Sequence, residues 1–95
     1  MLKVKVRVFA RLRELLKSRE IEVELSDGAT LVDLLGALVE IYGKELKDYL
    51  FSESGGLKEH FMIYINGVGV NEAGGVNKVL KEGDVVAILP PISGG

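Results

Sequence analysis

Five apolar residues follow one another at Val85-Val86-Ala87-Ile88-Leu89, directly after the turn-forming pair Gly83-Asp84. A strand without a polar residue on either face is typical of the interior of a sheet, or of a strand that keeps one face for a partner. We therefore expect residues 85–89 to form the central strand of a sheet, parallel to the first strand of the chain.

Two segments near the N-terminus predict an antiparallel pair of strands. Residues 2–10 and residues 20–25 both alternate between apolar and mostly charged side chains, which is the period of a half-buried strand. The short connection between them favours antiparallel pairing. The outer face would then carry three basic side chains opposite three acidic ones, with each pair contributing ~0.2–1 kcal/mol: Lys3, Lys5 and Arg7 against Glu20, Glu22 and Glu24. This complementarity explains the basic N-terminus better than a site for a polyanion.

One long helix is expected after Thr30, which with Asp33 forms a capping pattern. Leucines and other apolar residues follow at three- and four-residue spacing up to Tyr42, and Gly43 is suited to end the helix. Residues 11–16 are expected to form either a turn of helix or a bulky hairpin loop, and residues 44–51 a second, shorter helical turn.

The hairpin signal Asn66-Gly67 predicts a turn between strands at 61–65 and 68–70. The element order therefore indicates an α+β roll, in which one main helix packs on a mixed sheet of four to five strands. We expect a single domain over residues 1–89 and an extended tail over residues 90–95.

Composition excludes several classes of function. The chain has 95 residues, 12 basic and 14 acidic side chains and no cysteine, which speaks against nucleic-acid binding, thiolate metal sites and cysteine catalysis. The one histidine, His60, is expected to face solvent rather than act as a catalytic base. No secretory leader and no apolar run of the ~20 residues needed for a membrane span are present, so we expect a cytoplasmic protein that binds no membrane.

The C-terminal segment carries the strongest functional signal: Leu89-Pro90-Pro91-Ile92-Ser93-Gly94-Gly95. Pro90 and Pro91 cannot continue a strand ladder and stiffen the backbone as it leaves the sheet. Gly94 and Gly95 lack a Cβ atom, so the last peptide could enter a slot as narrow as a backbone. Ser93 lies between these two parts.

The end of this tail is a carboxylate, which is a poor electrophile until one oxygen becomes a leaving group. ATP can supply that activation, but the chain has no phosphate-binding glycine loop. We therefore expect no bound cofactor and no enzymatic activity of its own. A partner enzyme would use ATP to adenylate the tail.

A docking surface for such a partner is expected beside the tail. Phe9 interrupts the polar face of the first strand, and the non-alternating strands must turn some apolar side chains away from the helix. Our candidates are Phe9, Met62, Tyr64 and Ile88. Burial in the core is an equal alternative for each of them except Phe9.

The chain resembles the MoaD family, the small sulfur-carrier subunits of molybdopterin synthase. The similar segments lie in order along the chain: Val8-Phe9-Ala10-Arg11-Leu12-Arg13-Glu14-Leu15, Thr30-Leu31-x-Asp33-Leu34-Leu35, Ile65-Asn66-Gly67, and Gly83-Asp84-x-Val86-Ala87-Ile88-x-Pro90-Pro91-x-Ser93-Gly94-Gly95. Residues 42–60 resemble longer archaeal members, some of which are ubiquitin-like protein modifiers.

This resemblance implies a ubiquitin-like β-grasp fold and a sulfur-transfer cycle. A ubiquitin-activating-type adenylyltransferase would adenylate Gly95, sulfur would give a C-terminal thiocarboxylate, and the large synthase subunit would pass that sulfur to a pterin precursor. Three functions stay open: this sulfur carrier, a modifier joined to lysines through Gly95, and a non-reactive interaction module. A carrier for thiamine synthesis shares the tail, but residues 9–15 and Pro90-Pro91 favour MoaD.

Overall fold

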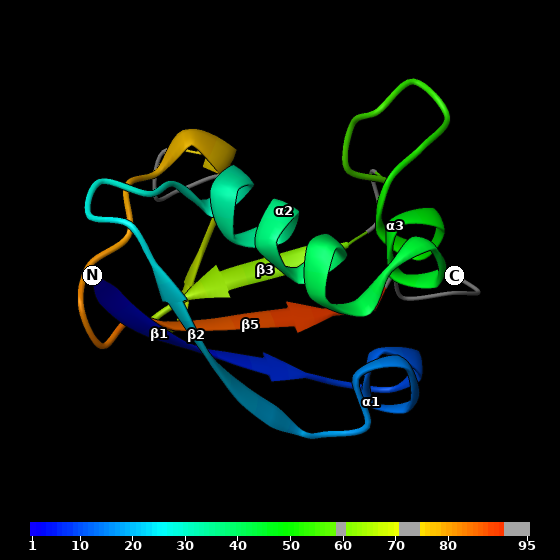
Figure 1. Ribbon diagram of the computed structural model, residues 1–95, viewed down its shortest axis with the longest axis horizontal. Coiled ribbons are helices and arrows are strands. Elements are labelled where there is room, and N and C mark those ends of the chain that lie inside the picture. Colours follow the sequence, from blue (N-terminus) through cyan, green and yellow to red (C-terminus); the bar gives the residue numbers. More distant parts are fainter. Residues whose placement is uncertain (59–60, 71–74, 91–95) are drawn as a thin grey trace.

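The computed structural model describes residues 1–58, 61–70 and 75–90. A five-stranded sheet carries helices on one face, with the longest helix lying diagonally across it (Figure 1). The elements are β1 (Leu2–Val8), α1 (Arg11–Leu16), β2 (Glu20–Leu25), α2 (Leu31–Tyr42), α3 (Lys44–Leu50), β3 (Met62–Ile65), β4 (Val68–Gly69), the 3-10 turn η1 (Gly75–Asn77) and β5 (Val85–Leu89).

The strand order β2-β1-β5-β3-β4 confirms the predicted central place of β5. β5 pairs in parallel with β1 and antiparallel with β3, so both of its edges are hydrogen bonded. The α+β architecture predicted from the sequence is therefore confirmed, as a mixed sheet covered by α2.

The β1–β2 pair has the register that the charge pattern predicts. Lys3 lies opposite Glu24, Lys5 opposite Glu22 and Arg7 opposite Glu20. The alternate residues of β1 are buried beneath the helices. Arg7 Nε lies 3.7 Å from Glu20 Oε2, and because both side chains are exposed this pair contributes little beyond the local pairing preference.

The first strand ends two residues earlier than its alternation predicts. Ala10 has φ +51° and ψ −127°, a backbone conformation outside the strand region. This residue redirects the chain from β1 into α1. Phe9 therefore follows the last residue of the strand instead of lying within it.

The capping pattern at the start of α2 is confirmed. The Thr30 hydroxyl oxygen accepts a hydrogen bond from the Asp33 N–H at 3.3 Å, and Asp33 Oδ2 accepts one from the Thr30 N–H at 2.9 Å. These reciprocal bonds satisfy two donors that a helix start leaves free. At the other end, Gly43 has φ +87° and donates its N–H to the Val39 carbonyl at 2.7 Å, so α3 can begin at once.

The core lies between α2 and the sheet. The four inward residues of α2 are at most 1% exposed: Leu31, Leu34, Leu35 and Leu38. They join the inward side chains of β1 and β5 in one buried cluster, to which α1 and α3 add Leu12 and Leu50. The helices thus cover one face of the sheet and leave the other face to solvent or to a partner.

The predicted hairpin turn is also a tie between distant segments. Asn66 and Gly67 both have positive φ, as a tight two-residue turn requires. The Asn66 side chain donates to Asp84 Oδ1 at 2.8 Å and accepts from the Val85 N–H at 2.9 Å. The hairpin turn is thereby held against the start of β5, the strand that carries the tail.

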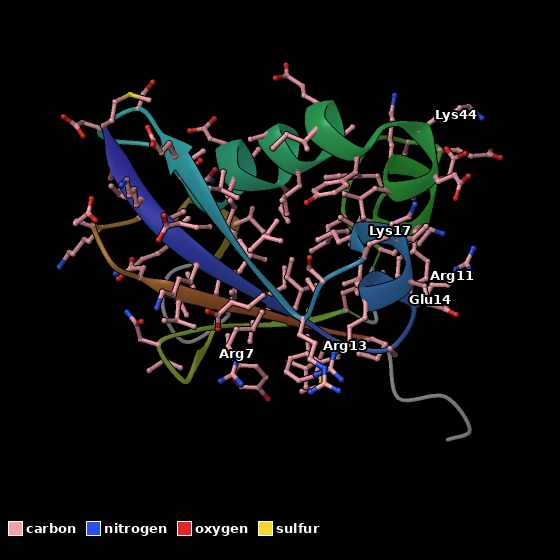
Figure 2. The ribbon with its side chains drawn as sticks, turned by 60° about the horizontal axis from the view of Figure 1, so that its bottom comes forward. Arg7, Arg11, Arg13, Glu14, Lys17 and Lys44 are labelled. Carbon is pink, nitrogen blue, oxygen red and sulfur yellow. The ribbon has the colours of Figure 1, made fainter. Side chains whose placement is uncertain are left out.

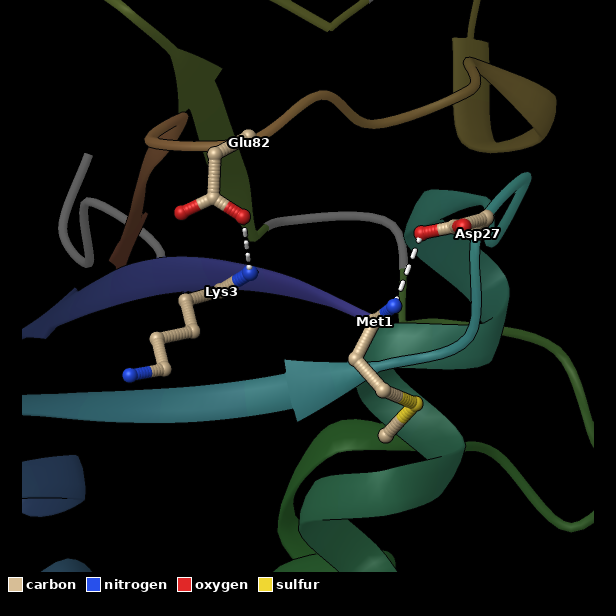
Figure 3. A network of polar contacts seen from close by, with 4 residues as sticks. All are labelled: Met1, Lys3, Asp27 and Glu82. Atoms are coloured by element: carbon tan, nitrogen blue, oxygen red, sulfur yellow. Dashed lines mark hydrogen bonds and ion pairs between the residues drawn. The ribbon is translucent and has the colours of Figure 1, made fainter.

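The start of β1 is held by two exposed contacts, drawn in Figure 3. The N-terminal ammonium lies 3.2 Å from Asp27 Oδ1, and the Lys3 N–H donates to Glu82 Oε1 at 2.9 Å. These contacts fix the end of the sheet opposite to that from which the tail leaves.

Candidate functional site

The root of the tail is the C-terminal end of β5. Leu89 pairs with Met62 of β3, and Ile88 pairs with Val8 of β1, so the strand is held on both edges to its end. Pro90 follows and is half-buried. The predicted tail residues Pro91, Ser93, Gly94 and Gly95 lie outside the described residues, and so does His60. Their roles stay predictions.

The face of the sheet opposite α2 carries apolar side chains beside this root. Tyr64 pairs with Ala87, and Met62 pairs with Leu89, which places all four on the outer face. Met62 is 39% exposed, and the other three are half-buried. We call this group, together with Phe9, the outer apolar surface. Met62 and Tyr64 thus lie on the outer face, and their contact with a partner stays a prediction.

The prediction that Ile88 faces a partner is wrong. Ile88 is 0% exposed and belongs to the core, as does Val86. Ile88 lies opposite Ile63, and directly opposed residues share a face, so both point toward the helices. The outward residues of this strand are its alternates, Ala87 and Leu89. The sequence of β3 held a sign of this orientation: Tyr64 has a polar hydroxyl and is expected to face outward, and its partner Ala87 must then face outward too.

A guanidinium group completes this surface on the side of Phe9. The Arg13 Cζ atom lies 4.9 Å from the centre of the Phe9 ring, and Arg13 Nε donates to the Val8 carbonyl at 2.9 Å. One turn of α1 and the conformation of Ala10 bring the cation back over the ring. Arg13 was not among the residues predicted for this surface, and the only sign of it in the sequence is its spacing of four residues from Phe9 into a helical turn.

Arg7 also lies on the outer face, so the apolar surface has cations beside it. Figure 2 shows Arg7 and Arg13 on the same side of the sheet, whereas Lys17 and Lys44 lie toward α1 and α3. Arg7 is engaged by Glu20, and Arg11 by Glu14 at 3.6 Å. The arrangement suits a protein interface, since a ring that carries a fixed cation offers both apolar contact and a hydrogen-bonding edge.

No group of three His, Cys, Asp or Glu side chains that could hold a metal ion occurs in residues 1–58, 61–70 and 75–90. Within the same residues, none of the helices is long and apolar enough to cross a membrane.

A five-stranded mixed sheet that is covered by one long helix, with a central last strand, defines a ubiquitin-like β-grasp domain. The chain belongs to the ThiS family, whose model matches residues 6–95. This family comprises small sulfur carriers and ubiquitin-like modifiers. This match does not distinguish the MoaD branch, which the resemblance suggested, from the other members of the family.

Three similar proteins give the family its context. Small archaeal modifier protein 1 of Haloferax volcanii is 35% identical over 94% of this chain and 97% of its own. Its crystal structure superposes with a TM-score of 0.86 at 28% identity, covering 97% of this chain and 100% of that one. The molybdopterin synthase sulfur carrier subunit of Chlamydomonas reinhardtii is 32% identical over 99% of this chain and 100% of its own. A chain of the BexX/CysO complex of Amycolatopsis orientalis has a TM-score of 0.79 at 27% identity over 97% of this chain and 99% of that one.

Proposed function

We propose that this chain is a sulfur carrier of molybdopterin biosynthesis, with the carboxylate of Gly95 as the group that carries sulfur. The observation that supports the proposal is the placement of β5, which is hydrogen bonded on both edges and ends at Leu89, directly before Pro90 and beside the outer apolar surface. A tail rooted in a strand that is paired on both edges can be pulled into a partner's active site without loosening the domain.

The chemistry begins with activation of the carboxylate. Within a partner adenylyltransferase of the ubiquitin-activating type, a Gly95 carboxylate oxygen attacks the α-phosphorus of ATP and pyrophosphate leaves. Hydrosulfide supplied by a partner then attacks the carbonyl carbon of the acyl adenylate, forming a C–S bond as the C–O bond to AMP breaks, and loss of the S–H proton leaves the C-terminal thiocarboxylate. The missing side chains of Gly94 and Gly95 let this carbonyl reach the end of a narrow slot. Because the cycle consumes ATP, we expect it to run in the cytoplasm.

The outer apolar surface would bind the partners in turn. Its Phe9 and Met62 provide apolar area, and Arg13 provides a fixed donor beside them. We assign this surface to the adenylyltransferase and to the large subunit of molybdopterin synthase, which would receive the thiocarboxylate. Support comes from the relative in Chlamydomonas reinhardtii, which is named as the carrier subunit of that synthase.

Intact-mass analysis of the protein purified from its own host tests this function. The expected result is a species in which one sulfur has replaced one oxygen at Gly95, and which co-purifies with a synthase large subunit. Absence of this species under conditions in which the host makes its pterin cofactor would contradict the proposal.

Protein modification is the second candidate, and the identity to small archaeal modifier protein 1 favours it specifically. The same adenylate would then be attacked by a lysine amine of another protein, with formation of an isopeptide bond. Trypsin cleaves this chain for the last time after Lys81, so branched remnants of residues 82–95 on lysines of other proteins would identify this function. Their loss on deletion of the gene would tie them to this chain.

A further inference from the structure

In the part of the chain that the structure describes, the edge of β2 that faces away from β1 is open. β2 stands first in the strand order, with β1 as its neighbour. The Val8 N–H donates to the Arg19 carbonyl at 3.0 Å, so these two residues form a hydrogen-bonded pair of the β1–β2 ladder. In an antiparallel ladder such pairs alternate with pairs whose backbone groups point away from the partner strand. The backbone groups of Glu20, Glu22 and Glu24 therefore point outward, and within the described ranges no hydrogen bond uses them. Such a row of N–H and C=O groups is a template for another strand.

The side chains along this edge have one sign of charge. Glu20, Glu22 and Glu24 are exposed on the outer face of the sheet. Of the three, Glu20 has an ion pair with Arg7 in the described part of the chain. A residue inside a sheet has a cross-strand neighbour on each side. On the side of β1, the neighbour of Glu24 is Lys3 and the neighbour of Glu22 is Lys5. No strand among the described residues fills the other side of Glu22 and Glu24.

The inner face of the same edge is apolar. Ile21 is half-buried against the core, whereas the next inward residues, Val23 and Leu25, are buried. A strand added here would place its own inward side chains against Ile21. Figure 2 shows β2 alongside β1, at the rim of the sheet and away from β5.

The charge and the apolar inner face of the β2 edge indicate which kind of strand can bind there. Two copies of this chain that joined through their β2 edges would bring glutamates beside glutamates, which is destabilising. β1 itself shows the complementary pattern, with basic residues at every second position and valines between them. We propose that the β2 edge binds an extended segment of a partner protein in which Lys or Arg alternates with apolar residues. This proposal does not depend on the chemistry proposed for Gly95.

Hydrogen exchange of the full-length protein, followed by NMR, tests this site directly. The probe is a capped peptide in which Lys and Val alternate. The matched control is a permuted peptide of the same composition, with its lysines contiguous. The alternating peptide should slow exchange of the Glu20, Glu22 and Glu24 amides at least ~10-fold, since those N–H groups become hydrogen bonded. The permuted peptide should not slow it.

Two variants test the charges. Glu22→Lys should weaken binding of the alternating peptide roughly three- to tenfold, because an attractive cross-strand pair becomes a repulsive one. Glu40→Lys makes the same change of charge at an exposed position of α2 and should alter the affinity less than about twofold. A dispersed amide spectrum checks that each variant is folded. If Glu22→Lys fails to fold, amide hydrogen exchange of the unaltered protein in the presence of each peptide still tests the proposal.

Three outcomes would overturn the proposal. The first is unchanged exchange of the three amides at saturating alternating peptide. The second is equal binding of the permuted peptide, which would mean attraction by net charge. The third is protection that rises with protein concentration in the absence of peptide, which would make a second copy the occupant.

Discussion

Ile88 and Leu89 are adjacent residues of β5 with opposite environments. Ile88 is fully buried beneath the helices, and Leu89 lies half-buried on the outer face beside the root of the tail. The two side chains are similar in size and hydropathy, so their different roles come from position alone. Mutations at these two residues should therefore affect different properties.

Ile88→Ala should lower the free energy of unfolding by about 2–5 kcal/mol, because it removes buried methylene groups and leaves a cavity. Leu89→Ala should cost less stability and instead weaken binding to the adenylyltransferase. Urea denaturation measures the first effect and calorimetric titration the second. Equal losses of stability for the two variants would mean that Leu89 belongs to the core.

Gly94→Ala should abolish adenylation with an unchanged Tm, because the added Cβ collides in the partner's slot while the tail contributes little to the core. Pyrophosphate release in the presence of the adenylyltransferase and ATP measures this. Gly36→Ala is the matched control, since a Cβ atom added at Gly36 of α2 would meet no other atom within 4 Å and should leave adenylation intact. A loss of stability of ~2–5 kcal/mol for Gly94→Ala would show that the tail packs against the domain.

Among the elements, α1 is short but sets the shape of the site. It follows Ala10, whose positive φ turns the chain, and it returns Arg13 over the ring of Phe9. The main helix α2 is determined by its own ends: the capping hydrogen bonds between Thr30 and Asp33 fix where it starts, and Gly43 fixes where it stops. A side-chain cap therefore defines α2, whereas the turn at Ala10 and the contacts of Arg13 with Val8 and Phe9 give α1 its function.

Thr30→Ala should lower the free energy of unfolding by ~1 kcal/mol, because the Asp33 N–H loses its side-chain acceptor. Thr30→Ser keeps the hydroxyl and should retain most of that stability. Urea denaturation of the three proteins measures the difference. Equal stability of the alanine and serine variants would show that the cap contributes nothing measurable.

In the molecule as a whole, the two faces of the sheet have different roles: one holds the core, and we expect the other to bind partners. The helix-covered face holds the buried cluster, and the opposite face carries the outer apolar surface and the cross-strand charges. The tie between Asn66 and Asp84 joins the hairpin to the strand that bears the tail. We therefore expect the domain to unfold as one cooperative unit.

Leu35→Ala should destabilise that unit by about 2–5 kcal/mol while leaving adenylation of the tail unchanged at temperatures where the variant is folded. Circular dichroism and tyrosine fluorescence should follow one shared unfolding transition. Val32→Ala, at a position of α2 that is 46% exposed, is the control and should change stability by less than ~0.5 kcal/mol. Separate transitions by the two probes would contradict a single unit.

The elements and their order could be predicted from local patterns in the chain. Alternation in β1 and β2, the Thr30 cap, the Asn66-Gly67 turn and the unbroken apolar run of β5 each correspond to an observed element. The central place of β5 also followed from composition, because an unbroken apolar run is typical of a strand inside a sheet, with neighbours on both edges. These features depend on the spacing of residues along a short segment, which the chain fixes before it folds.

Three properties of the site became visible only in the folded molecule: the outward side of β5, the cation that covers Phe9, and the edge of the sheet that stays open. A strand without polar residues has no mark of its own for inside and outside, so the outward set of β5 is chosen by its register with β3. The contact between Arg13 and Phe9 depends on the turn at Ala10, and the edge position of β2 on the order of all five strands. The outward set of β5 and the open edge arise from pairings between segments distant along the chain, and the contact of Arg13 with Phe9 arises from a positive φ that an alanine does not signal, so all three emerge only when the chain is folded.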